Sequence, residues 1–489
     1  MGVGRLFDLV IANGIVLDGS GGAPYEADIG VAGDRIAAVA ERGDLDGSRR
    51  IEASGRIVAP GFIDSHTHDD GYLLIEPGMT PKISQGVTSV VIGNCGISLA
   101  PTFDRPPAPP MNLLGADRLF RFRSMASYLA ELEGTPPAVN AIPLIGLTTL
   151  RRSVMTDLEK EATPEEVARM SALFNEALEA GVVGFSTGLF YPNAAASTPQ
   201  EVVGVAAAAR GQNLVYATHL RNEADWIVPA LVEALDIGRK LDARVLLSHH
   251  KLIGVANHGR SKETIAIVHQ GRLRQKIGLD LYPYVAGSSI LNMKTVEGTE
   301  RVVVSWSDPH PEYAGRDLED VCRELEMSTA EAVDFLSPAG GILFMMSEAD
   351  VKAILSYDAT MIGSDGLPND KHPHPRLWGT FPRVLGRYSR ELNLISLPEA
   401  VRRMTGLTAE FFGLEDRGLV KVGYKADLTI FDPDRVLDIA DWDNPTTPST
   451  GIEYVLVNGS LVWVDGSPTG ARPGQVVRKR RSGASPSQG

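Results

Sequence analysis

Side chains of the types that bind metal ions follow several short apolar runs of this sequence. "GFIDSHTHDD" carries His66 and His68 two residues apart, a spacing that places both imidazoles on one face of an extended chain. "VVIGNC" ends at Cys95, one of only two cysteines among 489 residues. Three further runs, "LVYATH", "RVLLSH" and "ATMIGSD", end at His219, His249 and Asp365. Imidazole, thiolate and carboxylate are ligands that zinc accepts, so these residues predict a zinc site.

Each of these signals has an ordinary structural explanation when it is taken alone. A histidine at the end of a strand is more often a hydrogen-bonded structural residue, and a buried cysteine usually behaves as a small hydrophobic side chain. Four of the ten histidines, one of the two cysteines and one aspartate nevertheless occur where predicted strands end. This shared position favours a metal site over coincidence.

The runs that carry these residues belong to a repeated pattern of strands and helices. Short β-branched runs alternate with longer amphipathic stretches, which is typical of βα units with parallel strands. One such stretch begins at Thr163, which forms a capping-box signature with Glu166, and Gly181 suits its end. The eight predicted strands are 61–66, 88–93, 138–146, 183–187, 214–219, 244–249, 276–282 and 359–365. Eight strands predict a (β/α)8 barrel, whose active site lies at their C-terminal ends.

The two ends of the chain differ from this pattern. Residues 7–60 and 418–470 are turn-rich and predict antiparallel strands, with hairpins expected at Asn13-Gly14 and Asn458-Gly459. We expect one small β-sandwich built from both termini. The sequence thus predicts a sandwich part at 1–60, a metal-dependent barrel at 61–413 and a second sandwich part with a tail at 414–489. Two connections, roughly 95–135 and 285–347, are long for a barrel, and the second predicts a lid inserted between strands 7 and 8.

Composition narrows the class of protein further. The chain is 43% hydrophobic and 22% charged, with a net charge of −14, which indicates a soluble globular protein and argues against nucleic-acid binding. No apolar run approaches the length of about 20 residues that spans a bilayer, so we expect no membrane partner. Two cysteines cannot form a disulfide framework, which favours a cytoplasmic location. The oligomeric state stays open.

Larger motifs resemble a known family. "GFIDSHTHDD", followed by paired barrel histidines and an aspartate after the last strand, resembles the amidohydrolase superfamily. "VIGNCGIS", "THLRNEAD", "LLSHHK", "LYPYVAGSS" and "HPRLWGTFPRVLGRY" resemble the N-acyl-D-amino-acid deacylases, also called D-aminoacylases. The resemblance covers essentially the whole chain. It implies hydrolysis of an N-acyl-D-amino acid, a small-molecule substrate, to a carboxylate and a free D-amino acid.

The resemblance also implies roles for the candidate residues. A tight zinc would be held by Cys95, His219 and His249, which leaves the fourth tetrahedral position open, as a catalytic zinc requires. A second, weaker metal position would be lined by His66, His68 and Asp365. Asp365 would also be the catalytic proton carrier, taking a proton from water and delivering it to the leaving nitrogen.

An N-acylated amino acid is an anion, so an acidic protein needs a local cationic pocket to capture it. The resemblance assigns the binding of the substrate α-carboxylate to four residues, Lys251, Tyr282, Ser288 and Arg376. Arginine can bind a carboxylate through two parallel hydrogen bonds, and hydroxyl groups add neutral donors.

Other functions stay possible at this stage. A cyclic-amide hydrolase of the hydantoinase or dihydroorotase kind shares the barrel and the HxH pair, but such enzymes depend on a bridging carboxylated lysine, and the Cys95 motif counts against them. A dipeptidase acting on D-amino-acid or isoaspartyl substrates is harder to exclude. The alternative outside enzymes is an inactive amidohydrolase-like scaffold, although every proposed ligand is present.

Overall fold

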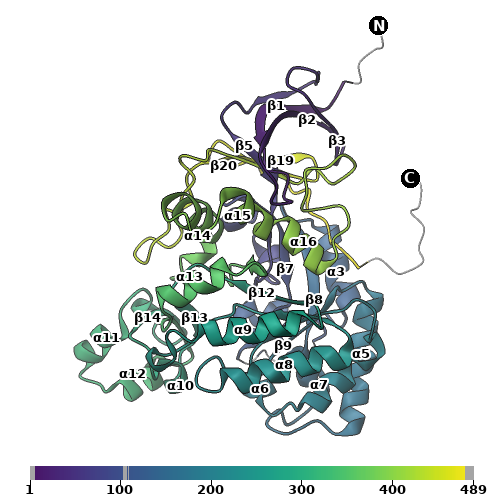
Figure 1. Cartoon of the computed structure of the whole chain (residues 1–489). Coiled ribbons are helices and arrows are strands. Elements are labelled where there is room, and N and C mark those ends of the chain that lie inside the picture. Colours follow the sequence, from purple (N-terminus) through teal and green to yellow (C-terminus); the bar gives the residue numbers. More distant parts are fainter. Residues whose placement is uncertain (1–5, 103–106, 108, 480–489) are drawn as a thin grey trace.

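Eight parallel strands form a barrel at the centre of the molecule (Figure 1). The structure is a computed structural model and describes residues 6–102, 107 and 109–479. The barrel strands pair in chain order and are β6 Phe62–Asp64, β7 Val87–Ile92, β8 Asn140–Gly146, β9 Gly184–Gly188, β10 Val215–His219, β11 Arg244–Leu247, β12 Ile277–Leu281 and β16 Thr360–Ile362. All eight overlap the predicted strands, and the predicted barrel is confirmed.

The barrel closes where its first strand meets its last. The amide of Ser65 donates to the carbonyl of Ile362 (3.3 Å), and the amide of Asp365 donates to the carbonyl of His66 (2.8 Å). Thr67 forms a parallel bridge with Gly366. These contacts lie at the C-terminal ends of β6 and β16, so the closing seam is formed by residues next to the predicted metal ligands.

Helices follow the strands and cover the barrel. The predicted capping box is present at the start of α5, where Thr163 and Glu166 exchange side-chain-to-backbone hydrogen bonds. Gly181, two residues after α5 ends, has φ +95°, which suits glycine. The helices outside the insertion are α1 Tyr72–Ile75, α2 Thr80–Ile83, α3 Met125–Gly134, α4 Leu147–Val154, α5 Pro164–Glu179, α6 Pro192–Ala195, α7 Pro199–Ala206, α8 Ile227–Leu241, α9 Ser261–Arg272, α13 Glu348–Ser356, α14 Arg376–Arg383, α15 Leu397–Met404 and α16 Gly406–Phe412.

The predicted insertion forms a small subdomain between β12 and β16, at the lower left of Figure 1. Its three antiparallel strands pair in the order β13-β15-β14 and pack with three helices around a separate apolar cluster that includes Val304, Val321 and Leu336. Its elements are β13 Ala286–Ile290, α10 Met293–Val296, β14 Arg301–Ser307, α11 Leu318–Leu325, α12 Thr329–Leu336 and β15 Ala339–Phe344.

Both ends of the chain build one further module, at the top of Figure 1. Its nine strands are continuous because β5 pairs with β17, and they enclose an apolar cluster that contains Ile11, Ile29 and Leu456. The strands are β1 Leu9–Val16, β2 Tyr25–Ala32, β3 Arg35–Ala40, β4 Arg50–Glu52, β5 Ile57–Pro60, β17 Leu428–Phe431, β18 Ile452–Val457, β19 Ser460–Val464 and β20 Ser467–Pro468. The predicted joint module is confirmed, while the boundaries near residues 60 and 413 stay predictions. Residues 480–489 of the predicted tail lie outside the described residues.

One of the two predicted Asn-Gly hairpins is wrong. Asn13 and Gly14 lie inside β1, at a bulge where the pairing with β2 changes register between Ile11 and Gly14. A β-carbon on Gly14 would lie 2.5 Å from Val58 Cγ2, so glycine here permits the close approach of β5. Asn458 and Gly459, with φ +47° and +77°, do form the β18–β19 hairpin.

Among the described residues, no helix has both the length and the apolar character needed to cross a membrane.

Two glycines in equivalent hairpin turns give a test of this module. Gly459 and Gly466 both have positive φ, but an added β-carbon would overlap the carbonyl oxygen of Gly33 only at Gly459. Gly466→Ala should lower the free energy of unfolding by about 1 kcal/mol, since a left-handed non-glycine residue costs roughly that much. Gly459→Ala should lower it more, as measured by urea denaturation. Equal losses would contradict the close contact with Gly33.

Candidate active site

The six predicted metal-binding side chains meet at the C-terminal end of the barrel, and all are buried. Their ligand atoms fall into two groups, each with every atom within 4.8 Å of the others. We call the first the Asp365 group, which contains His66, His68, Cys95 and Asp365. We call the second the His219 group, which contains Cys95, His219 and His249. Cys95 therefore lies between the two and belongs to both.

Sharp turns at the strand ends direct these side chains into the barrel. Cys95, His249 and Asp365 have φ of +52°, +36° and +49°, a left-handed conformation that is unfavourable for residues other than glycine. Such strain persists only where the surroundings hold it. The amide of His249 donates to Asp280 Oδ1 (2.5 Å), and the amide of Asp365 donates to the carbonyl of His66.

The Cys95 sulfur is surrounded by imidazole nitrogens. It lies 3.3 Å from His66 Nε2, 3.3 Å from His249 Nε2 and 3.8 Å from His219 Nδ1. Sulfur and nitrogen ligands of a tetrahedral zinc are separated by about 3.5 Å, given the usual bond lengths. The donor types and their spacing therefore fit zinc.

The environment of Cys95 favours the thiolate form. Burial opposes ionisation, but the charges of His66 and His249 and hydrogen bonds from His219 and His249 outweigh it and hold the pKa of Cys95 well below its usual value. A thiolate is the form in which cysteine binds a metal ion.

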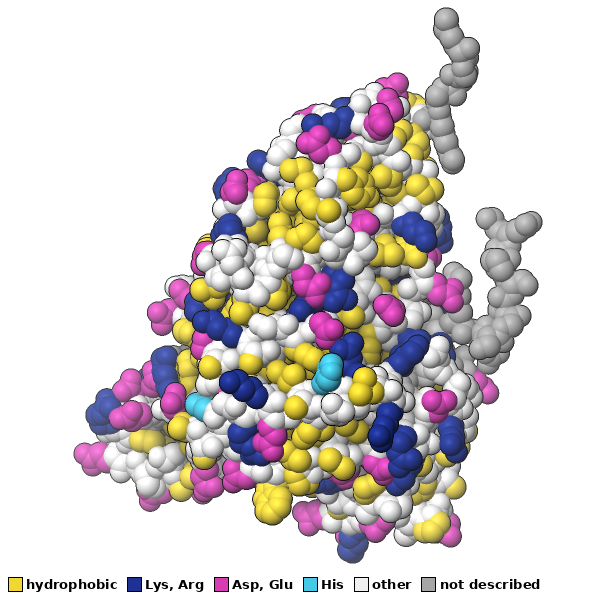
Figure 2. Space-filling model, viewed as in Figure 1, with side chains coloured by type: hydrophobic (Ala, Val, Ile, Leu, Met, Phe, Trp, Pro, Cys, Tyr) yellow, Lys and Arg dark blue, Asp and Glu magenta, His cyan; other side chains and the backbone are white. Residues whose placement is uncertain are grey.

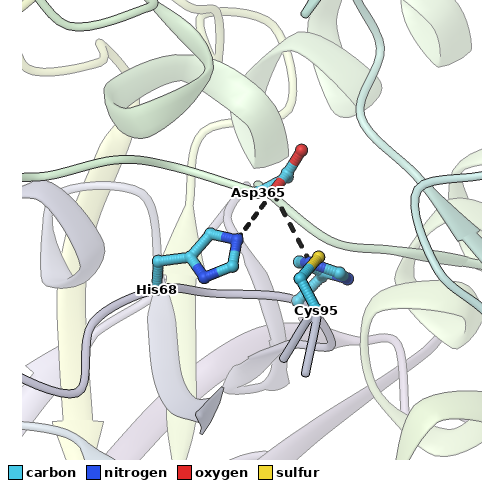
Figure 3. Close-up of side chains that lie close together, drawn as sticks. His68, Cys95 and Asp365 are labelled. Carbon is cyan, nitrogen blue, oxygen red and sulfur yellow. Dashed lines mark hydrogen bonds and ion pairs between the residues drawn. The ribbon is translucent and has the colours of Figure 1, made fainter. Parts of the chain in front are cut away.

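Asp365 faces His68, as Figure 3 shows, and it also lies near His66. Its Oδ1 lies 3.2 Å from His68 Nε2 and 3.5 Å from His66 Nε2, and its Oδ2 lies 3.0 Å from Arg376 Nη1. Burial raises the pKa of this carboxyl, but the charges of Arg376 and His249 and a hydrogen bond from His68 more than offset the effect and hold the pKa well below its usual value. Asp365 is thus a carboxylate with one oxygen held by Arg376 and the other directed at His66 and His68.

Glu223 is a residue of the site that the sequence did not single out. Its carboxylate lies 3.3 Å from His219 Nε2, 3.1 Å from His249 Nδ1 and 2.8 Å from Lys251 Nζ. These ring nitrogens are the ones that face away from Cys95. Glu223 therefore fixes the orientation of both imidazoles, as carboxylates near metal-binding histidines do. It lies in a loop after β10, where no periodicity marks it, and only its place in "THLRNEAD" could have indicated it.

Three of the predicted substrate-binding residues lie together beside Asp365. The Arg376 guanidinium stacks over the ring of Tyr282 at 4.3 Å, and both residues are buried, as is Lys251. The hydroxyl of Tyr282 and the Nε of Arg376 have no hydrogen-bond partner. Buried donors without partners are what a bound carboxylate would satisfy.

Ser288 lies at the edge of this cluster, on β13 of the insertion. Its carbonyl oxygen is 3.5 Å from Arg376 Nη2, but its hydroxyl donates to Asp370 Oδ2 at 3.3 Å. His250 points away from the site and contacts Thr264 Oγ1 at 2.9 Å, as expected for a structural residue.

Comparisons with known proteins identify the family of this chain. A model described as "Amidohydrolase family" matches residues 49–253 and 311–463. D-aminoacylase of Alcaligenes xylosoxydans xylosoxydans is 50% identical and aligns over 97% of this chain and 98% of its own length. The chain belongs to the amidohydrolase family, in the group that contains the D-aminoacylases. N-acyl-D-aspartate deacylase of the same organism is also 50% identical and aligns over 96% of this chain and 95% of its own length.

A solved structure of this amidohydrolase group contains zinc. N-acyl-D-glutamate deacylase from Bordetella bronchiseptica, in complex with zinc and a phosphonate inhibitor described as a mimic of the tetrahedral reaction intermediate, is 42% identical. It superposes with a TM-score of 0.91 and covers 97% of this chain and 100% of its own. The family predicted from the sequence motifs is confirmed.

The position of Glu223 predicts an effect on metal affinity. Glu223→Gln should weaken zinc binding by about 10- to 100-fold, which is typical for the loss of a carboxylate that orients a metal-binding histidine. Competition with a chromogenic chelator measures the affinity. The control is Glu233→Gln. Glu233 lies on α8, pairs with Arg221 (2.8 Å) and belongs to neither group of candidate metal ligands. Equal zinc affinity in the two variants would rule out this role for Glu223.

Proposed function

We infer that this amidohydrolase is a zinc-dependent enzyme that hydrolyses the amide bond of N-acyl-D-amino acids to a carboxylate and a free D-amino acid. The observation that carries the inference is the buried Cys95 thiolate among the imidazoles of His66, His219 and His249. It occurs in a chain that is half identical to both D-aminoacylase and N-acyl-D-aspartate deacylase.

The His219 group would hold the tight zinc through one sulfur and two nitrogens, which leaves one position open for water or substrate. When bound, zinc polarises the amide carbonyl and lowers the pKa of the attacking water. His66, His68 and Asp365 would line a second, weaker metal position. This assignment is supported by the sharing of Cys95 between the two groups.

Asp365 is the proposed proton carrier. It accepts a proton from the attacking water as the carbon–oxygen bond forms, and it delivers that proton to the nitrogen as the carbon–nitrogen bond breaks. The charge of Arg376, 3.0 Å from Oδ2, keeps the carboxylate ionised and ready to accept. Its Oδ1, 3.2 Å from His68 Nε2, is directed at the metal-binding side chains, where the attacking water would lie.

The substrate α-carboxylate would be bound by Lys251, Tyr282 and Arg376, with Ser288 at the edge of the pocket. Local capture is needed because the protein carries a net charge of −14. On the face shown in Figure 2, Lys and Arg side chains are mixed with Asp and Glu side chains and form no large basic patch. Lys251 and Arg376, which are paired with Glu223 and Asp365, would supply a local attraction that this face lacks.

A cytoplasmic location is proposed on the cysteine content. Both cysteines, Cys95 and Cys322, are free, and Cys95 needs a reduced thiol to bind zinc.

The reaction is tested with a substrate panel. The wild type, with zinc added, should cleave N-acetyl-D-amino acids and leave N-acetyl-L-amino acids, hydantoins and isoaspartyl dipeptides uncut. Asp365→Asn should lower kcat by about 10²–10⁴-fold, the usual contribution of general acid–base catalysis, with zinc retained. Cys95→Ala should lose tightly bound zinc as well as activity. Turnover confined to a hydantoin or a dipeptide would replace the proposed function by that alternative.

The carboxylate pocket is tested by removing one hydroxyl. Tyr282→Phe should raise KM by about 10- to 100-fold, the equivalent of one hydrogen bond to a charged group, without loss of stability. Tyr284→Phe is the matched control, because the Tyr284 hydroxyl is also buried without a hydrogen-bond partner but its ring packs on Trp442 and Arg383. A KM that changes equally in both variants would contradict the role of Tyr282.

A further inference from the structure

A lysine outside the proposed active site is buried beneath it. Lys82 lies on α2 with 1% of its side chain exposed. Its ammonium contacts three groups, Asp64 Oδ2 at 2.8 Å, Ser364 Oγ at 2.8 Å and Asp69 Oδ2 at 3.3 Å. An ammonium has three donors, and all three are occupied. Lysine is rarely buried this completely, and here two carboxylates match its charge. The question is what this buried network holds in place.

Two of the three partners join the barrel's first and last strands. Asp64 ends β6, and its Oδ1 accepts from the amides of Ser364 (2.8 Å) and His66 (3.3 Å). Ser364 Oγ in turn accepts from the amide of Gly366 (3.3 Å). The amides on both sides of Asp365 are therefore held by the groups that the lysine binds. This is the segment in which Asp365 has its unfavourable left-handed φ.

The third partner extends the network to the other histidine. Asp69 directly follows His68, and neither of its carboxylate oxygens has a hydrogen-bond partner other than the ion pair with Lys82. The same ammonium is thus anchored next to His66, next to His68 and next to Asp365.

The His219 group is held by different residues. Glu223 contacts both His219 and His249, and the amide that follows Cys95 donates to Ser186 Oγ at 2.9 Å. The three polar contacts of the buried ammonium are all on the side of the Asp365 group. Asp280 Oδ1 contacts both groups, at the amide of His249 (2.5 Å) and at His66 Nδ1 (3.7 Å), whereas the Lys82 network supports the Asp365 group alone.

We propose that Lys82 is a positioning residue, which fixes Asp365 relative to His66 and His68 across the closing seam of the barrel. Without its ammonium, the Asp365 carboxylate no longer keeps its distance of 3.2 Å from His68 Nε2. Proton transfer and the weaker metal position then suffer, while the zinc position of the His219 group is unaffected. The catalytic part of this proposal rests on the proposed function, which assigns proton transfer to Asp365.

The test compares three variants of the full-length protein. Lys82→Met removes the ammonium, and Ser364→Ala removes one of its contacts without burying an unpaired charge, so it folds even if Lys82→Met does not. Arg151→Met is the matched control, because Arg151 is also fully buried and ion-paired, with Glu201, but in the helical layer. For each variant, kcat, KM, the melting temperature and the affinities for the first and second equivalents of zinc are measured.

Ser364→Ala and Lys82→Met should lower kcat by about 10- to 100-fold and weaken the affinity for the second equivalent of zinc by a similar factor. Losses of this size are usual when a supporting contact around a metal site is removed. The affinity for the first equivalent of zinc and the KM should not change. Arg151→Met should lower only the melting temperature. An equal loss of affinity for both equivalents of zinc would overturn the proposal. So would an unchanged kcat and an unchanged affinity for the second equivalent in Ser364→Ala. If the wild type cleaves no N-acyl-D-amino acid, the proposed function is wrong, and the second-zinc affinity alone decides the role of Lys82.

Discussion

The structure of the site depends on one buried thiolate. Its sulfur lies within 3.8 Å of a nitrogen of each of three imidazoles, and the backbone of Cys95 has a left-handed φ of +52°. A buried negative charge is costly unless positive charge or a metal ion surrounds it. The neighbouring histidines and the proposed zinc meet this requirement, and the sulfur is the one ligand atom that the two groups share.

The barrel supplies this arrangement by bringing distant segments to one end. Each ligand follows a different strand, apart from His66 and His68, and each strained strand end is held by a neighbouring polar group. Asp280 receives the amide of His249, Glu223 orients two imidazoles, and the Lys82 network joins the first strand to the last. The residues proposed to capture the substrate contact the same framework, since Arg376 contacts Asp365 and Lys251 contacts Glu223.

The sequence predicts which strand ends carry side chains of metal-binding types, because strand periodicity and strand ends are local features. His219 could be placed at the end of a strand, and the barrel then fixes which ends meet. Glu223 and Lys82 could not be found in this way, since one lies in a loop and the other on a four-residue helix. The role of Glu223 depends on His249, which follows the next strand, and that of Lys82 depends on Ser364, 282 residues away in the chain. The Asn13-Gly14 prediction failed for a similar reason, because the nearby β5, not the local turn preference, decides the conformation there.

The central claim is that the Cys95 sulfur is a ligand of the tight zinc, and X-ray absorption at the zinc edge tests it most directly. With one equivalent of zinc bound to the wild type, the account predicts one sulfur at about 2.3 Å together with imidazole nitrogens at about 2.0–2.1 Å. A first shell made only of nitrogen and oxygen would contradict it, because zinc would then be bound away from the thiolate on which the rest of the site is built.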